Sequence, residues 1–277
     1  MTQAPRSLIV QSEAIQRKSW RMLSSVAPPS LCDALGIRAK VSGSTLYQGA
    51  LKVPGAQFNK IFSFGLDGPT SSEAMESAEE WLREHCPKNS LMMVPPNEWN
   101  NELESMILNH GFQRYPLDIT IFHMDADAAP ESTRSSEIDV RPVSSEGAES
   151  FGRVLAEGLG CSVAELWLGA YAIGQPGLTA YLAYHGSTPV GAAALLVDGD
   201  WGWLFIAAVR PTFRNRGAQT ALLARRIADG KKAGVRTFNI GALRPAPGHT
   251  DVFASYRNIE RFGFKTAYHR KNYVLSD

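Results

Sequence analysis

Two arginines beside a glycine carry the clearest chemistry in this sequence. Arg214 and Arg216 precede Gly217, between an apolar run at residues 203–209 and a helical pattern that begins at Ala218. Helix N-termini leave backbone N–H groups without partners and carry partial positive charge. Gly217 has no Cβ, so a bulky anion can approach the backbone closely, and guanidinium groups bind phosphate oxygens. The spacing therefore predicts an anion site at this turn.

Two regular elements would position these side chains. Residues 203–209, WLFIAAV, predict a buried strand, which ends in a turn at Pro211. After Gly217 the apolar residues recur with helical period, at Leu222 and Ile227 among others. The alternative interpretation is an ordinary strand-to-helix connection with solvated arginines.

The whole stretch resembles the acyl-CoA-binding motif of the Gcn5-related N-acetyltransferases (the GNAT superfamily). That motif runs strand, Val-x-Pro, Arg/Gln-x-x-Gly-x-Gly/Ala, helix; here the last position is Gln219. The resemblance implies that acetyl-CoA binds as a cosubstrate, with a strand that splays from its neighbour and pairs with the pantetheine arm. The residues implied to contact it are Ala207, Ala208 (near the oxyanion-donating N–H), Val209, Arg214, Asn215, Arg216, Gly217, Ala218, Gln219 and Thr220.

A second stretch resembles the asparagine-containing helix of the same superfamily. Asn258 lies five residues before Gly263, and the resemblance implies that it contacts the cofactor arm. Many relatives place a tyrosine four residues before this glycine as the acid that protonates the thiolate, and here that position is Ile259. Tyr256, Tyr268 or water would then serve, or no acid is needed, because a thiol of pKa ~8.5 is a fair leaving group.

The base is the least defined part of the predicted site. Glu165 and Trp167 fall in the segment that lines the acceptor site in the family, although Glu165 also has the spacing of a helix-capping carboxylate after Ser162. Other candidates share only an ionisable side chain: His185, Asp198, Asp200 and Glu260. We take Tyr268, Tyr256 and Glu165 as the candidate catalytic residues, while Tyr268 could equally be a packed strand aromatic.

The order of predicted elements occurs twice. Residues 59–123 read strand, turn, helix, strand, helix, Gly-Phe, strand, as do the residues after 200. We predict an α/β fold with a mixed sheet: residues 1–124 as an incomplete GNAT-like domain with N-terminal helices, 125–136 as a linker, and 137–277 as the catalytic GNAT domain. The turn of the first half carries Asp67 and no arginine. An acid there would repel pyrophosphate, so this half should not bind acyl-CoA.

Composition restricts the remaining possibilities. The 277-residue chain has a net charge of +1, which favours neither nucleic acid nor an anionic membrane as a partner. Three scattered cysteines and six histidines form no metal-ligand spacing, so no metal is predicted. The first 23 residues are too charged for a membrane span and too weakly apolar for a signal peptide. We expect a cytoplasmic protein and leave a homodimer open.

The predicted function is transfer of an acetyl group from acetyl-CoA to a primary amine of a small molecule, directly in a ternary complex. No cysteine lies in either motif to form a covalent intermediate. Two alternatives stay open: a sensor that binds acyl-CoA or a metabolite without turnover, and a protein N-acetyltransferase.

Overall fold

The chain forms two compact units in a computed structural model that describes residues 4–130, 137–161, 167, 173–244 and 253–276. Unit 1 comprises residues 1–121, 241–253 and 266–277, and unit 2 comprises residues 122–240 and 254–265. The sequence-based boundary assigned residues 137–277 to one domain. By their contacts, two segments of that range belong to unit 1.

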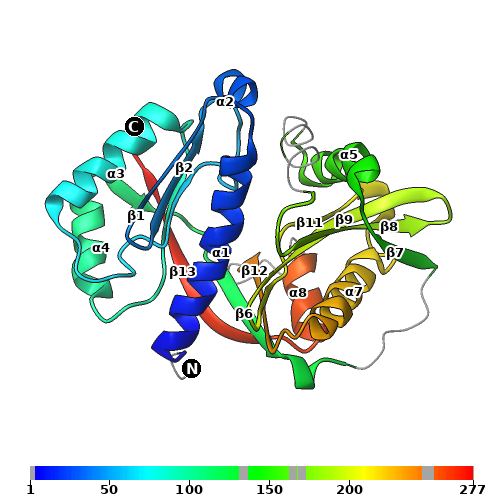
Figure 1. Ribbon diagram of the computed structural model, residues 1–277. Helices are drawn as coiled ribbons and strands as arrows, with labels where there is room; N and C mark the ends of the chain where they lie inside the picture. Colours follow the sequence, from blue (N-terminus) through cyan, green and yellow to red (C-terminus); the bar gives the residue numbers. More distant parts are fainter. Residues whose placement is uncertain (1–3, 131–136, 162–166, 168–172, 245–252, 277) are drawn as a thin grey trace. The chain divides into compact units, whose positions relative to one another are not determined.

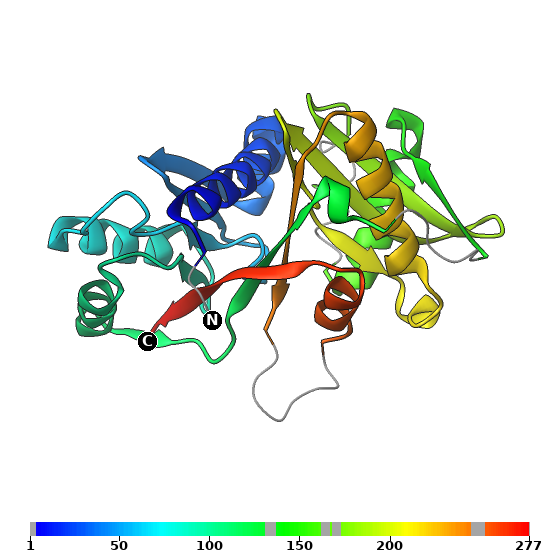
Figure 2. The ribbon, with the colours of Figure 1, turned by 90° about the horizontal axis from the view of Figure 1, so that it is seen from below.

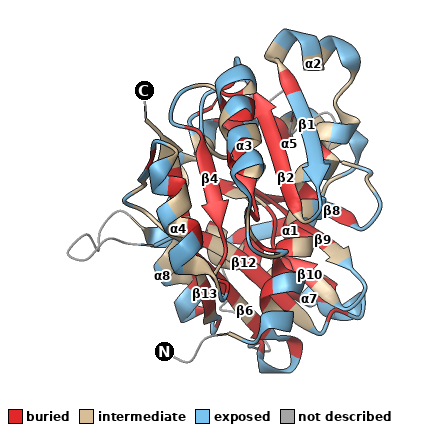
Figure 3. Ribbon diagram, turned by 90° about the vertical axis from the view of Figure 1, so that its left-hand side faces the viewer, coloured by how far each residue is buried: buried red, intermediate tan, exposed pale blue. Residues whose placement is uncertain are grey.

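Unit 1 is a mixed sheet with helices. Its order is β1-β2-β3-β4-β13, with β5 also on β13. The β1–β2 pair is an antiparallel hairpin, β3 and β4 are parallel, and β13 runs antiparallel to β4. Its elements are α1 (Arg6–Val26), α2 (Pro29–Leu35), β1 (Ile37–Ser42), β2 (Thr45–Ala50), β3 (Lys60–Phe62), α3 (Ser72–His85), β4 (Leu91–Val94), α4 (Asn100–Asn109), β5 (Phe112–Arg114) and, from residue 266, β13 (Lys265–Leu275). Figure 3 shows β2 and β4 buried and β1 as an exposed edge.

Unit 2 is a second mixed sheet between helices. Its order is β12-β10-β9-β8-β7, with β11 on β9 alone. Figure 1 shows α5 and α7 on opposite sides of these strands, and Figure 2 shows α8 on the same side as α7. Its elements are η1 (Ala126–Ala128), β7 (Ile138–Pro142), η2 (Ser145–Gly147), α5 (Ala148–Leu159), β8 (Leu178–His185), β9 (Thr188–Asp198), β10 (Trp201–Trp203), β11 (Ala207–Val209), η3 (Pro211–Phe213), α7 (Ala218–Lys232) and α8 (Ala254–Arg261). Strands β6 (Ile119–Asp125) and β12 (Thr237–Leu243) have residues in both units.

One expected element differs from the structure. The apolar run at residues 203–209 predicts one continuous strand, but the structure has two short strands separated by Leu204, Phe205 and Ile206. Apolar composition indicates burial of these residues and carries no information on where the hydrogen-bond ladder is interrupted.

A buried ionic cluster joins the first helix of unit 1 to its last strand. Glu13 of α1 accepts hydrogen bonds from the Tyr268 hydroxyl (2.6 Å), from Arg270 Nε (3.1 Å) and from Ser63 Oγ (2.6 Å). Arg270 also donates to Gln16 Oε1 (2.9 Å). Glu13 and Arg270 are 0% and 2% exposed. Removing one partner of such a pair leaves the other charge buried without compensation.

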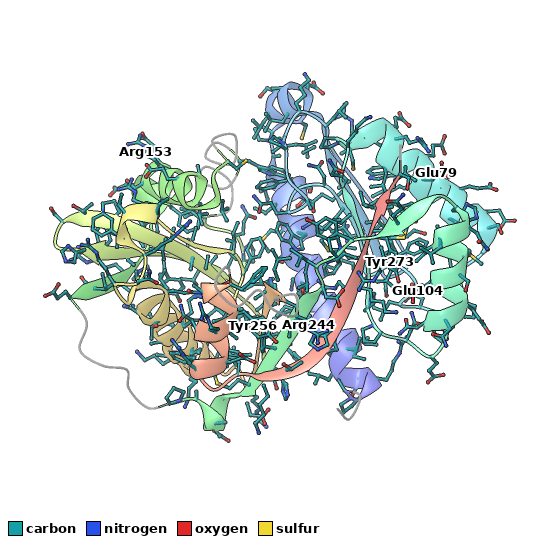
Figure 4. The ribbon with its side chains drawn as sticks, turned by 180° about the vertical axis from the view of Figure 1, so that it is seen from behind. Glu79, Glu104, Arg153, Arg244, Tyr256 and Tyr273 are labelled. Atoms are coloured by element: carbon teal, nitrogen blue, oxygen red, sulfur yellow. The ribbon has the colours of Figure 1, made fainter. Side chains whose placement is uncertain are left out.

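We predict that Glu13→Gln lowers the free energy of unfolding by about 3 kcal/mol or more, because Arg270 keeps its buried charge and loses its carboxylate. Glu79→Gln is the control, since Glu79 pairs with Arg83 at the surface of α3 (Figure 4); it should cost less than about 1 kcal/mol. Urea unfolding measures both. Equal, small effects would contradict the role of the cluster.

Candidate active site

The main structural feature of unit 2 is an interrupted strand. Trp203 of β10 lies opposite Leu196, and Ala207 of β11 lies opposite Ala193, so that β10–β11 contains one residue more than β9 over this span. The N–H of Ala194 reaches both the Phe205 (3.0 Å) and Ile206 (3.1 Å) carbonyls. This two-against-one arrangement is a β-bulge.

The bulge is a strained conformation. Ile206 has φ 31°, which is unfavourable for a β-branched residue. Such conformations persist where the surrounding structure holds them, and they often occur at functional sites.

The bulge leaves one edge of β11 open. On the side away from β9, β10 pairs with β12 as far as Trp203, and a further bond runs from Leu204 N–H to the Asn239 carbonyl (2.9 Å). Along the described strands, β11 itself pairs with β9 alone. Beyond Leu204 the two parallel strands therefore separate, as the family resemblance implies.

Alternation in the ladder shows which backbone groups face the open edge. Ile206 accepts from Ala194, and the Arg210 N–H donates to the Val190 carbonyl (2.9 Å). Because bonded and non-bonded pairs alternate in an antiparallel ladder, Ala208 is directed at its partner Ala192. The N–H and C=O groups of Ala207 and Val209 then point to the open edge, and the N–H of Ala208 points to β9. The oxyanion donor predicted near Ala208 would therefore be the N–H of Ala207 or Val209.

The turn after β11 presents the free N-terminus of a helix. Asn215 and Gly217 both have positive φ, 61° and 82°, and Gly217 is the N-cap of α7. No side chain caps α7, and its first turn contains no acid. The amides of residues 218–220 therefore remain available to an anion, with the helix dipole in its favour.

The arginines of the turn have different environments. Arg214 Nη2 donates to the Gly158 carbonyl at the end of α5 (3.1 Å), and the Arg216 guanidinium lies 5.3 Å from the centre of the Phe213 ring. Both side chains are exposed. Arg210, earlier in the turn, forms an ion pair with Glu157 (Nε to Oε2, 2.8 Å). Arg214 and Arg216 can therefore reach an anion at the turn.

A hydrogen bond joins the two predicted motifs. Asn258 Nδ2 of α8 donates to Gln219 Oε1 of α7 (2.7 Å). Gln219, the residue that departs from the family pattern, thus fixes the asparagine helix to the first turn of α7. Gln219 Nε2 and Asn258 Oδ1 keep a donor and an acceptor for a ligand.

The candidate acids and bases are not brought together. Tyr268 belongs to unit 1, and its hydroxyl is committed to Glu13; burial, with Glu13 adding, holds the pKa of Tyr268 well above its usual value. Tyr256 belongs to unit 2 and is half-buried against Phe122 (ring centroids 4.9 Å apart; Figure 4). Glu165 lies outside the described residues. Of the two tyrosines, only Tyr256 shares a unit with the turn.

The other candidates give no further constellation. Trp167 is fully buried. His185 Nε2 lies 3.2 Å from Glu137 Oε2, and Asp198, Asp200 and Glu260 are exposed. In the described part of the chain, no three His, Cys, Asp or Glu side chains gather as a metal site.

Two residues of unit 2, His123 and Gly158, were not predicted from the sequence as part of the site. His123 is half-buried on β6, and burial lowers its pKa, so the imidazole is neutral at pH 7 and could accept a proton. Gly158 lies in α5, where a Cβ would meet Ala208 Cβ at 2.6 Å and Val209 N at 3.2 Å. A glycine inside an amphipathic helix is a signal for close packing of this kind.

The corresponding helix of unit 1, α3, has a side-chain cap and an acid at its N-terminus. Ser71 caps α3 by accepting from the Ala74 N–H (3.3 Å), and Glu73 adds an acid to the first turn. In the preceding turn the Gly65 carbonyl accepts from Asn97 Nδ2 and Trp99 Nε1. The start of α3 therefore differs from that of α7, which has neither a side-chain cap nor an acid in its first turn.

Comparison with known proteins agrees with this geometry. Residues 156–264 match the model of the acetyltransferase (GNAT) family. No functionally curated protein shows a significant sequence match to the chain. The matched segment runs from the end of α5 to the end of α8 and contains both motifs. The family match therefore applies to this segment, which is less than half of the chain.

Solved structures show that the GNAT fold extends over both units. A GCN5-related N-acetyltransferase from Kribbella flavida is 13% identical and has a TM-score of 0.59, with 94% of this chain and 96% of that chain covered. A tandem GNAT protein from the clavulanic acid biosynthesis pathway is 14% identical (TM-score 0.52; 95% and 94% covered). The predicted tandem GNAT fold is confirmed. None of the described helices is long and apolar enough to cross a membrane.

We predict that Gly158→Ala destabilises the protein by about 1–3 kcal/mol, because the added methyl overlaps Ala208 and overpacks the contact between α5 and β11. The sign of the change in unfolding free energy distinguishes a close contact from a free helix position. Alanine at a free helix position would stabilise by up to about 1 kcal/mol. Thermal and urea unfolding measure the difference, and a stabilised variant would show that α5 does not pack against β11.

Proposed function

We propose that this chain is an acyltransferase that moves an acetyl group from acetyl-CoA to a primary amine of a small molecule, with both substrates bound together. The observation that carries the proposal is that two candidate binding elements, the edge of β11 and the start of α7, follow one another within residues 207–220 of unit 2. The open edge of β11 leads directly into the uncapped, arginine-bearing N-terminus of α7.

Each part of coenzyme A has a complementary part in this segment. The pyrophosphate would lie over the amides of residues 218–220, where the helix dipole and the side chains of Arg214 and Arg216 favour negative charge. The pantetheine arm carries two amides. Those amides can pair with the free backbone groups of Ala207 and Val209 as a further strand would, which places the thioester at the bulge end of β11.

The turn motif at residues 214–220 and Asn258 of α8 then form a single binding site. The bond between Asn258 and Gln219 holds α8 against the helix start, so the arm and the pyrophosphate would be bound by residues in direct contact. The side chain of Gln219 replaces the small residue of the family pattern and can donate to the pyrophosphate.

The chemistry requires a held thioester, a stabilised oxygen and a neutral amine. The amine nitrogen attacks the carbonyl carbon, the C–S bond breaks, and the thiolate leaves while the nitrogen loses a proton to water or a nearby base. Negative charge developing on the carbonyl oxygen would be stabilised by an N–H of the open edge, for which Val209 and Ala207 are the candidates. Ile259 is buried and provides no acid, so Tyr256 or water would protonate the thiolate.

The sensor function is the second candidate. It is favoured by Ile259, which occupies the position where many relatives place their catalytic tyrosine. Binding of acyl-CoA without turnover would then be the activity, and the assay below separates the two functions.

We predict that Arg214→Ala combined with Arg216→Ala weakens acetyl-CoA binding at least about tenfold, since hydrogen bonds to charged groups contribute about 1.5–3 kcal/mol each. Arg153→Ala is the matched control, because Arg153 is an exposed arginine of α5 paired with Glu149 (Figure 4). Calorimetric titration with acetyl-CoA measures all three proteins. Unchanged affinity in the double variant would remove the turn from the site.

We also predict that thiol is released from acetyl-CoA when a primary amine from a broad panel is added, in equal amount to the acetylated amine. The corresponding alcohols should give no release, because a neutral amine is the stronger nucleophile. Thiol titration and mass spectrometry of the product measure this. Tight binding with no release over the panel would establish the sensor function, and release with peptide amines alone would indicate a protein N-acetyltransferase.

A further inference from the structure

One arginine of α7, Arg226, is buried without a carboxylate partner among the described residues. Arg226 is 0% exposed. Among the described residues no carboxylate forms an ion pair with its guanidinium. Burial lowers the pKa of Arg226 to about 9, which still leaves it charged at neutral pH. An unpaired buried charge is costly, so its contacts need an explanation.

The guanidinium of Arg226 connects α7 to β9. Nε donates to the Leu222 carbonyl one turn earlier (3.0 Å), and Nη1 donates to the Ala194 carbonyl (3.1 Å). Nη2 is buried and has no hydrogen-bond partner among the described residues. The side chain thus attaches the helix to a single backbone position in the central strand of unit 2.

That position is the residue opposite the bulge. Ala194 is the one residue of β9 that opposes both Phe205 and Ile206. In a regular ladder the Ile206 N–H would donate to the Ala194 carbonyl. Among the described residues that bond is not formed. Arg226 supplies the missing donor.

We propose that Arg226 is a positioning residue: its buried guanidinium satisfies the Ala194 carbonyl at the bulge and so maintains the interruption that keeps the edge of β11 open. Without it the carbonyl would be buried and unsatisfied. The local structure would then relax either by closing the bulge or by admitting water. The inference deepens the proposed function, on which its consequence for acyl-CoA binding rests. The local effect on the bulge does not depend on that function.

Arg225 provides a matched control on the same helix. Its Nη1 also donates to a backbone carbonyl, that of Val140 (2.6 Å), and its Nε bonds Asp229. Val140 belongs to β7, the end strand of the unit 2 order, and β8 separates β7 from β9. Loss of Arg225 therefore removes a comparable helix-to-strand bond that is remote from the bulge.

The test compares Arg226→Met, Arg226→Lys and Arg225→Met by hydrogen exchange at two amides. The Ala194 amide lies opposite the bulge, and the Arg210 amide lies directly after β11. In Arg226→Met these two amides should exchange about tenfold faster, as expected for an unsatisfied buried group, while amides of α5 and β8 keep their rates. Arg226→Lys should restore much of the protection, and Arg225→Met should leave both amides unchanged. If Arg226→Met does not fold, Arg226→Lys takes its place. Because lysine restores the protection only in part, its exchange rates should still rise at these two amides and at no others in unit 2.

Coenzyme A affinity provides the second readout. We expect Arg226→Met to bind coenzyme A about tenfold more weakly with little loss in Arg225→Met. A uniform rise in exchange over unit 2, or none at the two amides, would overturn the positioning role whatever the affinity. Local loosening with a wild-type protein that binds no coenzyme A would instead support the role of Arg226 and reject the proposed function.

Discussion

The interrupted pairing of β10–β11 is the constraint on which the candidate site depends. A regular ladder would have satisfied the backbone of Ala207 and Val209 with β12 and left nothing for a ligand. The bulge at Phe205 and Ile206 separates the strands instead, at the expense of a positive φ at Ile206. Two contacts hold this geometry. Gly158 of α5 packs closely against β11, and Arg226 of α7 donates a hydrogen bond to the Ala194 carbonyl of β9. Contacts from α5 and α7 thus stabilise the strained backbone of Ile206.

The two units differ at the helix start where unit 2 has its candidate anion site. In both, a turn leads into a helix, and the difference lies in a few side chains. Ser71 and Glu73 occupy the N-terminus of α3, whereas α7 begins at Gly217 with neither a cap nor an acid. Because the free amides and the dipole are properties of any helix, binding is decided by whether the protein satisfies them itself. We therefore assign the proposed acyl-CoA site to unit 2.

Much of this architecture could be predicted from the sequence, since local signals encode it. The helix start after Gly217 lies where the glycine and the apolar period predicted it. The break at Ile206 could not be predicted, because no glycine marks its positive φ and an apolar run is equally compatible with a continuous strand. Tyr268 has no local signal for its partner either: Glu13 lies 255 residues away. Arg226 reads as one more charge on a basic helix, and only the fold shows that it is buried.

The most direct test of the central claim is the backbone amide spectrum of isotope-labelled protein titrated with coenzyme A. The open edge and the free helix start predict that the largest shift changes occur together, at Val209 and Ala207 on β11 and at residues 218–220 of α7. The first turn of α3, capped by Ser71, should not respond. Saturating coenzyme A that leaves the amides of β11 and α7 unchanged, or that shifts the start of α3 instead, would contradict the account.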